Sequence, residues 1–108
     1  MNCKKPFLFI ILIFTFLCYG QDYNSKVLIH FNKGLEYQNN EDWYEAREEY
    51  QQALQENPAF GEAWFNLAKC TYEINDFNLC LSYLDSAEKY EKDRTDIRNL
   101  RGMCLISL

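Results

Sequence analysis

The sequence predicts an all-α fold built from helical hairpins that stack side by side. Three observations lead to this prediction. Apolar side chains recur at helical spacing through most of the chain, and no stretch shows the strict alternation of a half-buried strand. In addition, a 34-residue shift superimposes one hairpin on the next. About five helices are therefore expected after the N-terminal segment.

The first twenty residues have the pattern of a secretory signal peptide. Two lysines precede an apolar run over residues 7–17, and small side chains follow at Cys18 and Gly20. This pattern predicts cleavage after Gly20 and export of residues 21–108 to the periplasm or the outside of the cell. The apolar run is shorter than the roughly 20 residues that a spanning helix needs. A membrane anchor over residues 7–19 is the alternative.

The next segment contains a polar lead-in over residues 21–26 and a first helix from residue 27 to about residue 38. A second helix is predicted over residues 43–56, where apolar and small side chains share one face and carboxylates the other. Asp42 followed by Glu45 predicts a capping box at its start. Asn57 precedes Pro58 and is therefore pushed out of helical geometry, which predicts the end of this helix.

Three more helices are predicted over residues 60–73, 77–90 and 94–107, with turns at residues 75–76 and 91–93. The 34-residue shift places small side chains where helices must approach each other and bulky ones where gaps must be filled. The expected repeat-packing residues are Gly34, Tyr37, Trp43, Ala46, Tyr50, Ala53, Pro58, Trp64, Leu67, Ala68, Phe77, Cys80, Leu84, Ala87 and Gly102.

This pattern resembles the tetratricopeptide repeat (TPR) family, whose unit reads Trp-x2-Leu-Gly-x2-Tyr, then Ala-x3-Phe, then a closing Pro. The first copy supplies Gly34, Tyr37, Ala46, Tyr50 and Pro58, and departs from the pattern at His30 and Lys33. The second supplies Trp64, Leu67, Ala68 and Ala87, with its tyrosine displaced from position 71 to 72. The resemblance gives units over residues 27–60 and 61–94, and residues 95–108 as the first helix of a third unit or a capping helix.

The resemblance implies a right-handed superhelix, an α-solenoid, whose concave surface is lined by the first helix of each unit. Family members commonly bind peptides or proteins on that surface. The shared register also places these residues there: Leu28, Gln38, Asn39, Glu62, Glu73, Asp96, Asn99, Leu100 and Ile106. The candidate partner-binding residues are Phe31, Asn32, Leu35, Phe65, Asn66, Lys69, Tyr72 and Met103. Of the residues that family members use to grip chaperone carboxylates only Asn66 is present, so that specialisation is disfavoured.

Charge and cysteine content limit the partners. Without residues 1–20 the chain has 9 basic and 16 acidic residues, a net charge of −7, which disfavours nucleic acid. Cys70, Cys80 and Cys104 each take the place of a small apolar residue. We therefore expect buried free thiols, although export would allow oxidation.

No catalytic or phosphate-binding motif is present, and no metal or cofactor site is expected. His30 is the single histidine and is interpreted as a packed ring, while Glu45, Glu48 and Glu49 are interpreted as a solvated helix face. The sequence thus predicts an exported, non-catalytic scaffold that binds a protein or peptide. The alternative is an assembly piece, or part of a longer array, that docks or self-associates through its apolar C-terminal helix.

Overall fold

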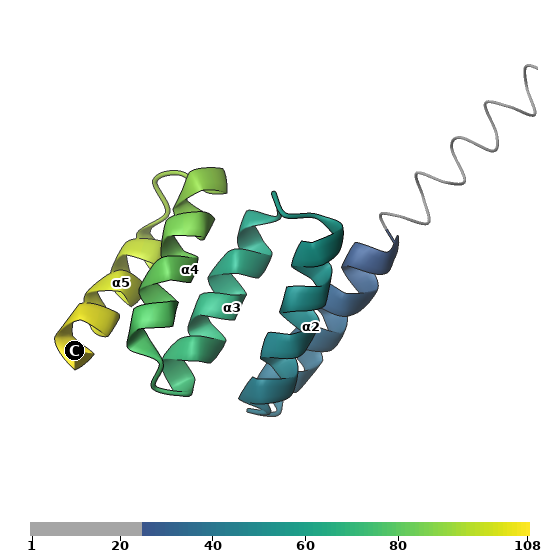
Figure 1. The fold of residues 1–108 in the computed structure, drawn as a ribbon, viewed down its shortest axis with the longest axis horizontal. Helices are drawn as coiled ribbons and strands as arrows, with labels where there is room; N and C mark the ends of the chain where they lie inside the picture. Colours follow the sequence, from purple (N-terminus) through teal and green to yellow (C-terminus); the bar gives the residue numbers. More distant parts are fainter. Residues whose placement is uncertain (1–24) are drawn as a thin grey trace, which may run out of the picture.

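The computed structural model describes residues 25–108, which form five helices and contain no strand (Figure 1). The first helix covers residues 25–39. It is followed by α2 (Trp43–Glu56), α3 (Gly61–Glu73), α4 (Phe77–Tyr90) and α5 (Thr95–Ser107). The all-α prediction is confirmed, and from residue 39 onward each helix end in the described residues lies within two residues of its predicted position.

The structure tests only part of what was predicted for the N-terminal segment. The predicted signal peptide lies outside the described residues. Ser25 and Lys26, which were assigned to the polar lead-in, are already helical. The described part of the first helix therefore begins within the predicted lead-in.

Helices that follow one another in the chain pack side by side, so that the fold is a single row of antiparallel helices. The first helix lies beside α2, and contacts then run from α2 to α3, from α3 to α4 and from α4 to α5 (Figure 1). A smaller contact joins α3 to α5. This arrangement is the helical-repeat solenoid that the 34-residue period predicted.

The turn inside each hairpin is the same turn, used twice. The backbone N–H of Asp42 donates to the carbonyl of Tyr37 over 2.9 Å, and that of Asp76 donates to the carbonyl of Thr71 over the same distance. Glu41 and Asn75, at φ of 60° and 69°, are the left-handed residues of these turns. Both features belong to the Schellman motif that ends many helices. The two hairpins therefore reverse direction in the same way, which lets them stack.

The ends of α2 test two predictions about local structure. Asn57 is extended, with φ of −138°, and α2 ends before Pro58 as expected. The capping-box prediction is wrong, because the side chain of Asp42 makes no capping hydrogen bond. At the equivalent place in α4, Oδ1 of Asp76 accepts a hydrogen bond from the N–H of Leu79 over 3.2 Å. The backbone angles of the two aspartates are nearly the same, so the difference lies in how each side chain is turned.

Most of the expected repeat-packing residues are buried between the helices. The fully or almost fully buried ones are Ala46, Tyr50, Ala53, Leu67, Ala68, Cys80, Leu84 and Ala87. Gly34 is required at its position, because a Cβ there would lie 2.5 Å from Cε1 of Tyr50. The small residues thus allow the first helix and α2 to approach closely.

Residues at the two ends of the row lack this burial. Tyr37 on the first helix is 37% exposed, whereas Thr71, at the same place in the next repeat on α3, is fully buried. A Cβ at Gly102 on α5 would meet nothing within 4 Å. The physical reason is position: α3 has neighbours on both sides, whereas the first helix and α5 are the outer helices of the described row. Pro58 is exposed in its turn, and Trp43, Trp64 and Phe77 are half-buried.

Candidate functional site

A groove lies between α3 and α5, and Trp43 from the start of α2 also lines it. Its volume is about 260 Å³. The residues that line it combine apolar walls with a few charged and amide groups. They are Trp43, Phe65, Lys69, Tyr72, Glu73, Asp96, Asn99, Leu100 and Met103.

Phe65 forms part of this groove but is itself covered by a cation. The guanidinium carbon of Arg94 lies 4.9 Å from the ring centroid of Phe65. At the same place in the preceding repeat, the ring of Phe60 lies 4.7 Å from that of Phe31. The same packing contact is therefore made twice, once as an aromatic pair and once as a cation–π pair. Phe31 and Phe65 thus have packing partners within the chain.

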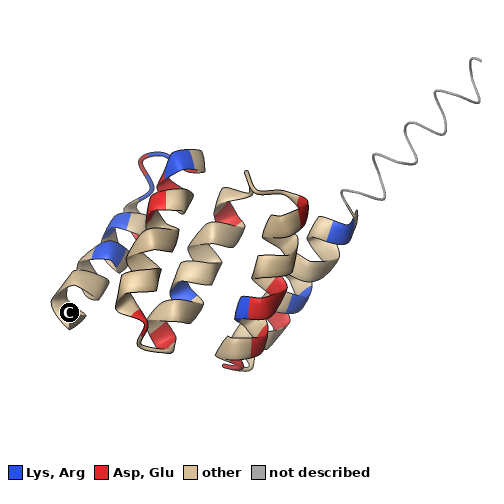
Figure 2. Cartoon of the chain, viewed as in Figure 1, with Lys and Arg blue, Asp and Glu red and all other residues tan. Residues whose placement is uncertain are grey.

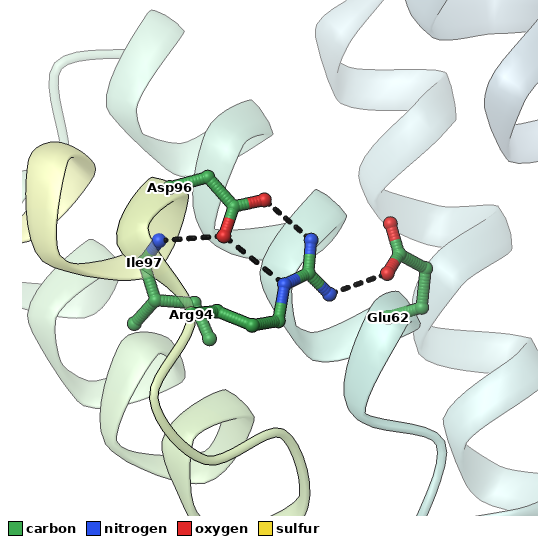
Figure 3. Close-up of polar contacts among 4 residues, drawn as sticks. All are labelled: Glu62, Arg94, Asp96 and Ile97. Atoms are coloured by element: carbon green, nitrogen blue, oxygen red, sulfur yellow. Dashed lines mark hydrogen bonds and ion pairs between the residues drawn. The ribbon is translucent and has the colours of Figure 1, made fainter.

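Arg94 also links the start of α5 to the start of α3 (Figure 3). Its Nη1 donates to Oε2 of Glu62 over 2.5 Å, and its Nε donates to Oδ1 of Asp96 over 3.0 Å. The same oxygen of Asp96 accepts from the N–H of Ile97 over 2.9 Å. The hydrogen bond from Arg94 holds the pKa of Asp96 below its usual value. Asp96 is therefore a charged, paired carboxylate, and this end of the groove is held in a fixed position.

The side chains nearest to solvent give the groove its chemical character. Tyr72 lies edge-on to Phe77 with 5.5 Å between ring centroids, and Met103 is 46% exposed. The ammonium nitrogen of Lys69 lies 5.8 Å from the ring centroid of Phe65. Such a surface can bury an apolar side chain and offer a cation and an amide to the polar groups beside it.

The structure brings together only part of the predicted binding surface. Phe65, Lys69, Tyr72 and Met103 line the groove, as do Glu73, Asp96, Asn99 and Leu100. The residues that the register placed on this surface but that do not line the groove are Leu28, Phe31, Asn32, Leu35, Gln38, Asn39, Glu62 and Ile106. Asn66 is only 5% exposed and so offers little surface to a partner. Trp43 was assigned to packing alone, and the signal that could have placed it in the groove is its position directly after the hairpin turn.

A second groove, which the sequence did not predict, lies between α2 and α4. It has a volume of about 580 Å³ and is more open than the first. None of its lining residues is charged: they are Gln51, Gln52, Leu54, Gln55, Pro58, Trp64, Leu67 and Tyr83. Nε1 of Trp64 already donates to the carbonyl of Pro58 over 2.8 Å, and Nε2 of Gln51 donates to Tyr83 over 3.5 Å. Fewer directed polar groups therefore remain for a ligand.

Charged residues are unevenly placed over the helices. Figure 2 shows acidic residues over α2 and the hairpin turns, and basic residues on α5 and in the loop before it. Arg101 of α5 donates to Asp85 and Glu88 of α4, each over 2.8 Å. This pairing neutralises part of the acidic surface of α4.

His30 on the first helix pairs with Glu49 on α2, and this pairing changes the assignment of Glu49. Nδ1 of His30 lies 2.7 Å from Oε2 of Glu49, and both side chains are half-buried. Glu49 is therefore an interhelix partner, and its assignment to the solvated face is wrong. Among residues 25–108 no group of three or more His, Cys, Asp or Glu side chains could hold a metal ion.

Comparison with known families matches this architecture. A sequence model described as tetratricopeptide repeat matches residues 39–104, more than half of the chain. The chain belongs to the tetratricopeptide repeat family. TPR domains are typically non-catalytic scaffolds for protein–protein interactions, and the family membership suggests that role here. No curated protein matches this TPR chain. Within the described residues, no helix is long and apolar enough to cross a membrane.

Proposed function

We propose that this TPR protein is an exported scaffold that binds a peptide segment of a protein partner in the groove between α3 and α5. The observation that supports this most directly is the composition of the groove. Tyr72, Met103 and Trp43 provide apolar surface that is not fully buried, and they come from three different helices. An apolar groove on a protein surface is a frequent mark of a binding site.

The size of the groove favours a peptide over a small-molecule substrate or cofactor. Its volume of about 260 Å³ lies below the roughly 300–1,000 Å³ of typical small-molecule sites. It suits one or two apolar side chains of a longer segment, with the rest of the segment running over the neighbouring surface. The groove is also open at its rim, so that a continuous chain can enter and leave.

The charged groups of the groove suit a segment that places polar groups on both sides of an apolar anchor. Lys69 offers a cation above Phe65, and Glu73 offers a carboxylate at the end of α3. Asp96 is already neutralised by Arg94. Asn99 can hydrogen-bond to a peptide backbone, because its amide both donates and accepts. Such pairings set orientation and specificity more than affinity.

The test is a selection of random peptides displayed on phage, with the purified chain as target. Selected peptides are synthesised, and their dissociation constants are measured by calorimetry for the wild type and for Met103→Ala. Loss of a buried anchor contact commonly costs about 1–2 kcal/mol, so we expect affinity to fall roughly 5- to 30-fold.

Leu105→Ala is the matched control, because Leu105 lies on the same helix, is exposed and does not line the groove. Circular dichroism checks that both variants keep the wild-type helix content. Selected peptides that bind both variants with the wild-type affinity would show that they bind elsewhere, and a selection that yields no peptide would also count against the proposal.

Export is supported by the signal-like pattern of residues 1–20. The measurement is N-terminal sequencing of the protein recovered from its native compartment. A sequence that begins at Gln21 is the expected result, and a chain that retains residues 7–19 in the membrane fraction would favour the anchor instead.

A second function is favoured by the outer face of α5. Leu105, Ile106 and Leu108 are 57%, 87% and 62% exposed, and a Cβ at Gly102 would meet no atom of the described residues within 4 Å. An assembly piece that docks through α5 would bury these side chains. Light scattering over a range of concentrations distinguishes the two functions, since docking of one copy on another gives a dimer or larger species and a peptide scaffold stays a monomer.

A further inference from the structure

Two of the three cysteines in the described residues meet inside the protein. Cys80 lies on α4 and Cys104 on α5, and neither is accessible to solvent. Their sulfur atoms are 2.7 Å apart. Cys70 is equally buried, but within residues 25–108 it makes no such contact with another sulfur. The sequence suggested three equivalent buried thiols, whereas the structure separates one pair from a single cysteine.

The repeat explains why these two cysteines meet. Ala46 on α2 and Cys70 on α3 belong to one cluster of buried side chains. The 34-residue shift converts this pair into Cys80 on α4 and Cys104 on α5, which share the other cluster. The repeat therefore puts an alanine and a cysteine at the two positions of the first cluster that are equivalent to Cys80 and Cys104 in the second.

We propose that Cys80 and Cys104 form a disulfide bond that joins α4 to α5. A disulfide places its sulfur atoms about 2.05 Å apart, so the pair has to close by less than ~1 Å. No other cysteine of the described residues competes, because Cys70 packs with the preceding hairpin. The bond would close a loop of the chain between residues 80 and 104.

The bond forms by exchange with a disulfide donor such as oxidised glutathione. One cysteine thiolate attacks the donor, which releases one glutathione thiolate and leaves a mixed disulfide on the protein. The second cysteine thiolate then attacks the protein sulfur of that mixed disulfide and releases the second glutathione. The protein loses two protons and two electrons, and the donor disulfide is reduced to two thiols.

The folded environment controls when this exchange occurs. Burial, with the contact to Cys104 as a further cause, raises the pKa of the Cys80 thiol to about 12. Since the thiolate is the reacting form, a closed native structure exchanges slowly. The bond therefore forms during folding, or when α5 separates from α4. Separation requires only local opening, because α5 lies at the end of the described row.

The position of the bond gives it a structural consequence. α5 carries Leu100 and Met103, which form one wall of the groove. A covalent link to α4 would hold this wall in place, although α5 packs only against α4 and α3 among the described helices. Formation of the bond does not depend on whether a peptide occupies the groove, so each proposal can fail without the other.

The experiment refolds the full chain in a mixture of oxidised and reduced glutathione and blocks the remaining thiols by alkylation. Cleavage after Lys, Arg and Glu places Cys70, Cys80 and Cys104 on separate peptides, residues 70–73, 74–88 and 102–108. Mass spectrometry should find peptides 74–88 and 102–108 joined, at a mass lower by two hydrogen atoms than their sum, with Cys70 alkylated. Cys70→Ser should retain the joined peptides, and Cys104→Ser should lose them.

Thermal unfolding supplies a second measurement that does not depend on peptide recovery. Reductant should lower the melting temperature of the wild type and Cys70→Ser by on the order of 10 °C, and leave Cys104→Ser unchanged. The proposal is overturned if Cys80 and Cys104 are both alkylated after refolding. It is also overturned if either cysteine is joined mainly to another cysteine of the chain.

A gain-of-function variant tests the geometric argument by itself. Ala46→Cys recreates, between α2 and α3, the pair that the repeat places between α4 and α5. Under the same refolding conditions Cys70 should become joined to residue 46 and escape alkylation. Cys70 that stays fully alkylated in this variant would contradict the equivalence of the two contacts.

Discussion

The contrast between Gly34 and Gly102 gives the sharpest test of the structure. The two glycines occupy the same place in the repeat, two periods apart, and both lie inside a helix. A Cβ at Gly34 would lie 2.5, 2.7 and 2.9 Å from three atoms of the Tyr50 ring. A Cβ at Gly102 would meet nothing within 4 Å. The same substitution by alanine should therefore be clearly less favourable at Gly34 than at Gly102.

The magnitude follows from two opposing terms. Alanine is favoured over glycine inside a helix by about 0.8–1.0 kcal/mol, and this term applies at both positions. At Gly34 the added methyl group also displaces a Tyr50 ring that is fully buried and whose hydroxyl donates to Gln38 over 2.7 Å. Overpacking of this kind costs about 1–3 kcal/mol. Gly102→Ala should therefore stabilise the chain by up to about 1 kcal/mol, and Gly34→Ala should be less stable than Gly102→Ala by about 1–3 kcal/mol.

The assay is urea unfolding followed by circular dichroism at low protein concentration, where association through α5 is smallest. Since about 1 kcal/mol moves the melting temperature of a small domain by roughly 4–8 °C, a thermal melt gives an independent reading. Equal shifts for the two variants would refute the packing of Gly34 against Tyr50. Destabilisation by Gly102→Ala would show that another segment packs against α5.

Three further predictions concern caps, turns and charge. Asp76→Ala should lower the free energy of unfolding by about 1 kcal/mol, and Asp42→Ala by clearly less, because of these two aspartates only Asp76 caps its helix. Chemical denaturation measures the free energy of unfolding of both variants. Glu41→Gly should raise the free energy of unfolding by up to about 1 kcal/mol, because the positive φ of Glu41 strains a residue that has a Cβ and does not strain glycine. A decrease in the free energy of unfolding would contradict this prediction. The pKa of Asp96 is lowered by its hydrogen bond from Arg94. The ionised carboxylate therefore stabilises the fold above its unfolded pKa of about 3.9, and this stabilisation is lost as the pH falls through the folded pKa. Asp96→Asn should therefore lose less stability than the wild type when the pH is lowered below about 4, as measured by denaturation at several pH values; parallel curves would argue against the Arg94 pairing.

Much of the fold could be predicted because residues that pack between helices recur at fixed positions of the repeat and can be recognised in the sequence. A small residue at Ala46 or Ala68 marks a place where two helices touch, and Asn57 before Pro58 marks a helix end. These are local or periodic constraints, which a single sequence displays. The capping box at Asp42 failed because a side-chain hydrogen bond depends on how the side chain is turned, which the residue pattern does not specify.

The candidate site was only partly predictable. The shared register placed Lys69, Tyr72 and Met103 on one surface, and in the structure the three side chains line one groove. It did not show that Phe65 lies beneath Arg94, or that Asn66 is buried. Those outcomes depend on which side chain of a neighbouring unit covers each position, and that side chain changes from one repeat to the next.

The sequence alone therefore determined the helices, their order and the repeat to which each residue belongs, because helical periodicity and the 34-residue period are properties of the chain itself. Only the tertiary structure decided which equivalent positions of the repeat are covered by a neighbouring side chain and which are left uncovered. Gly34 is covered by Tyr50 and Gly102 is not, and Cys104 meets a sulfur where Cys70 meets the side-chain cluster of Ala46. The reason is that burial depends on which helix packs against each position: α2 follows the first helix and places Tyr50 against Gly34, whereas within the described residues no helix follows α5 to cover Gly102.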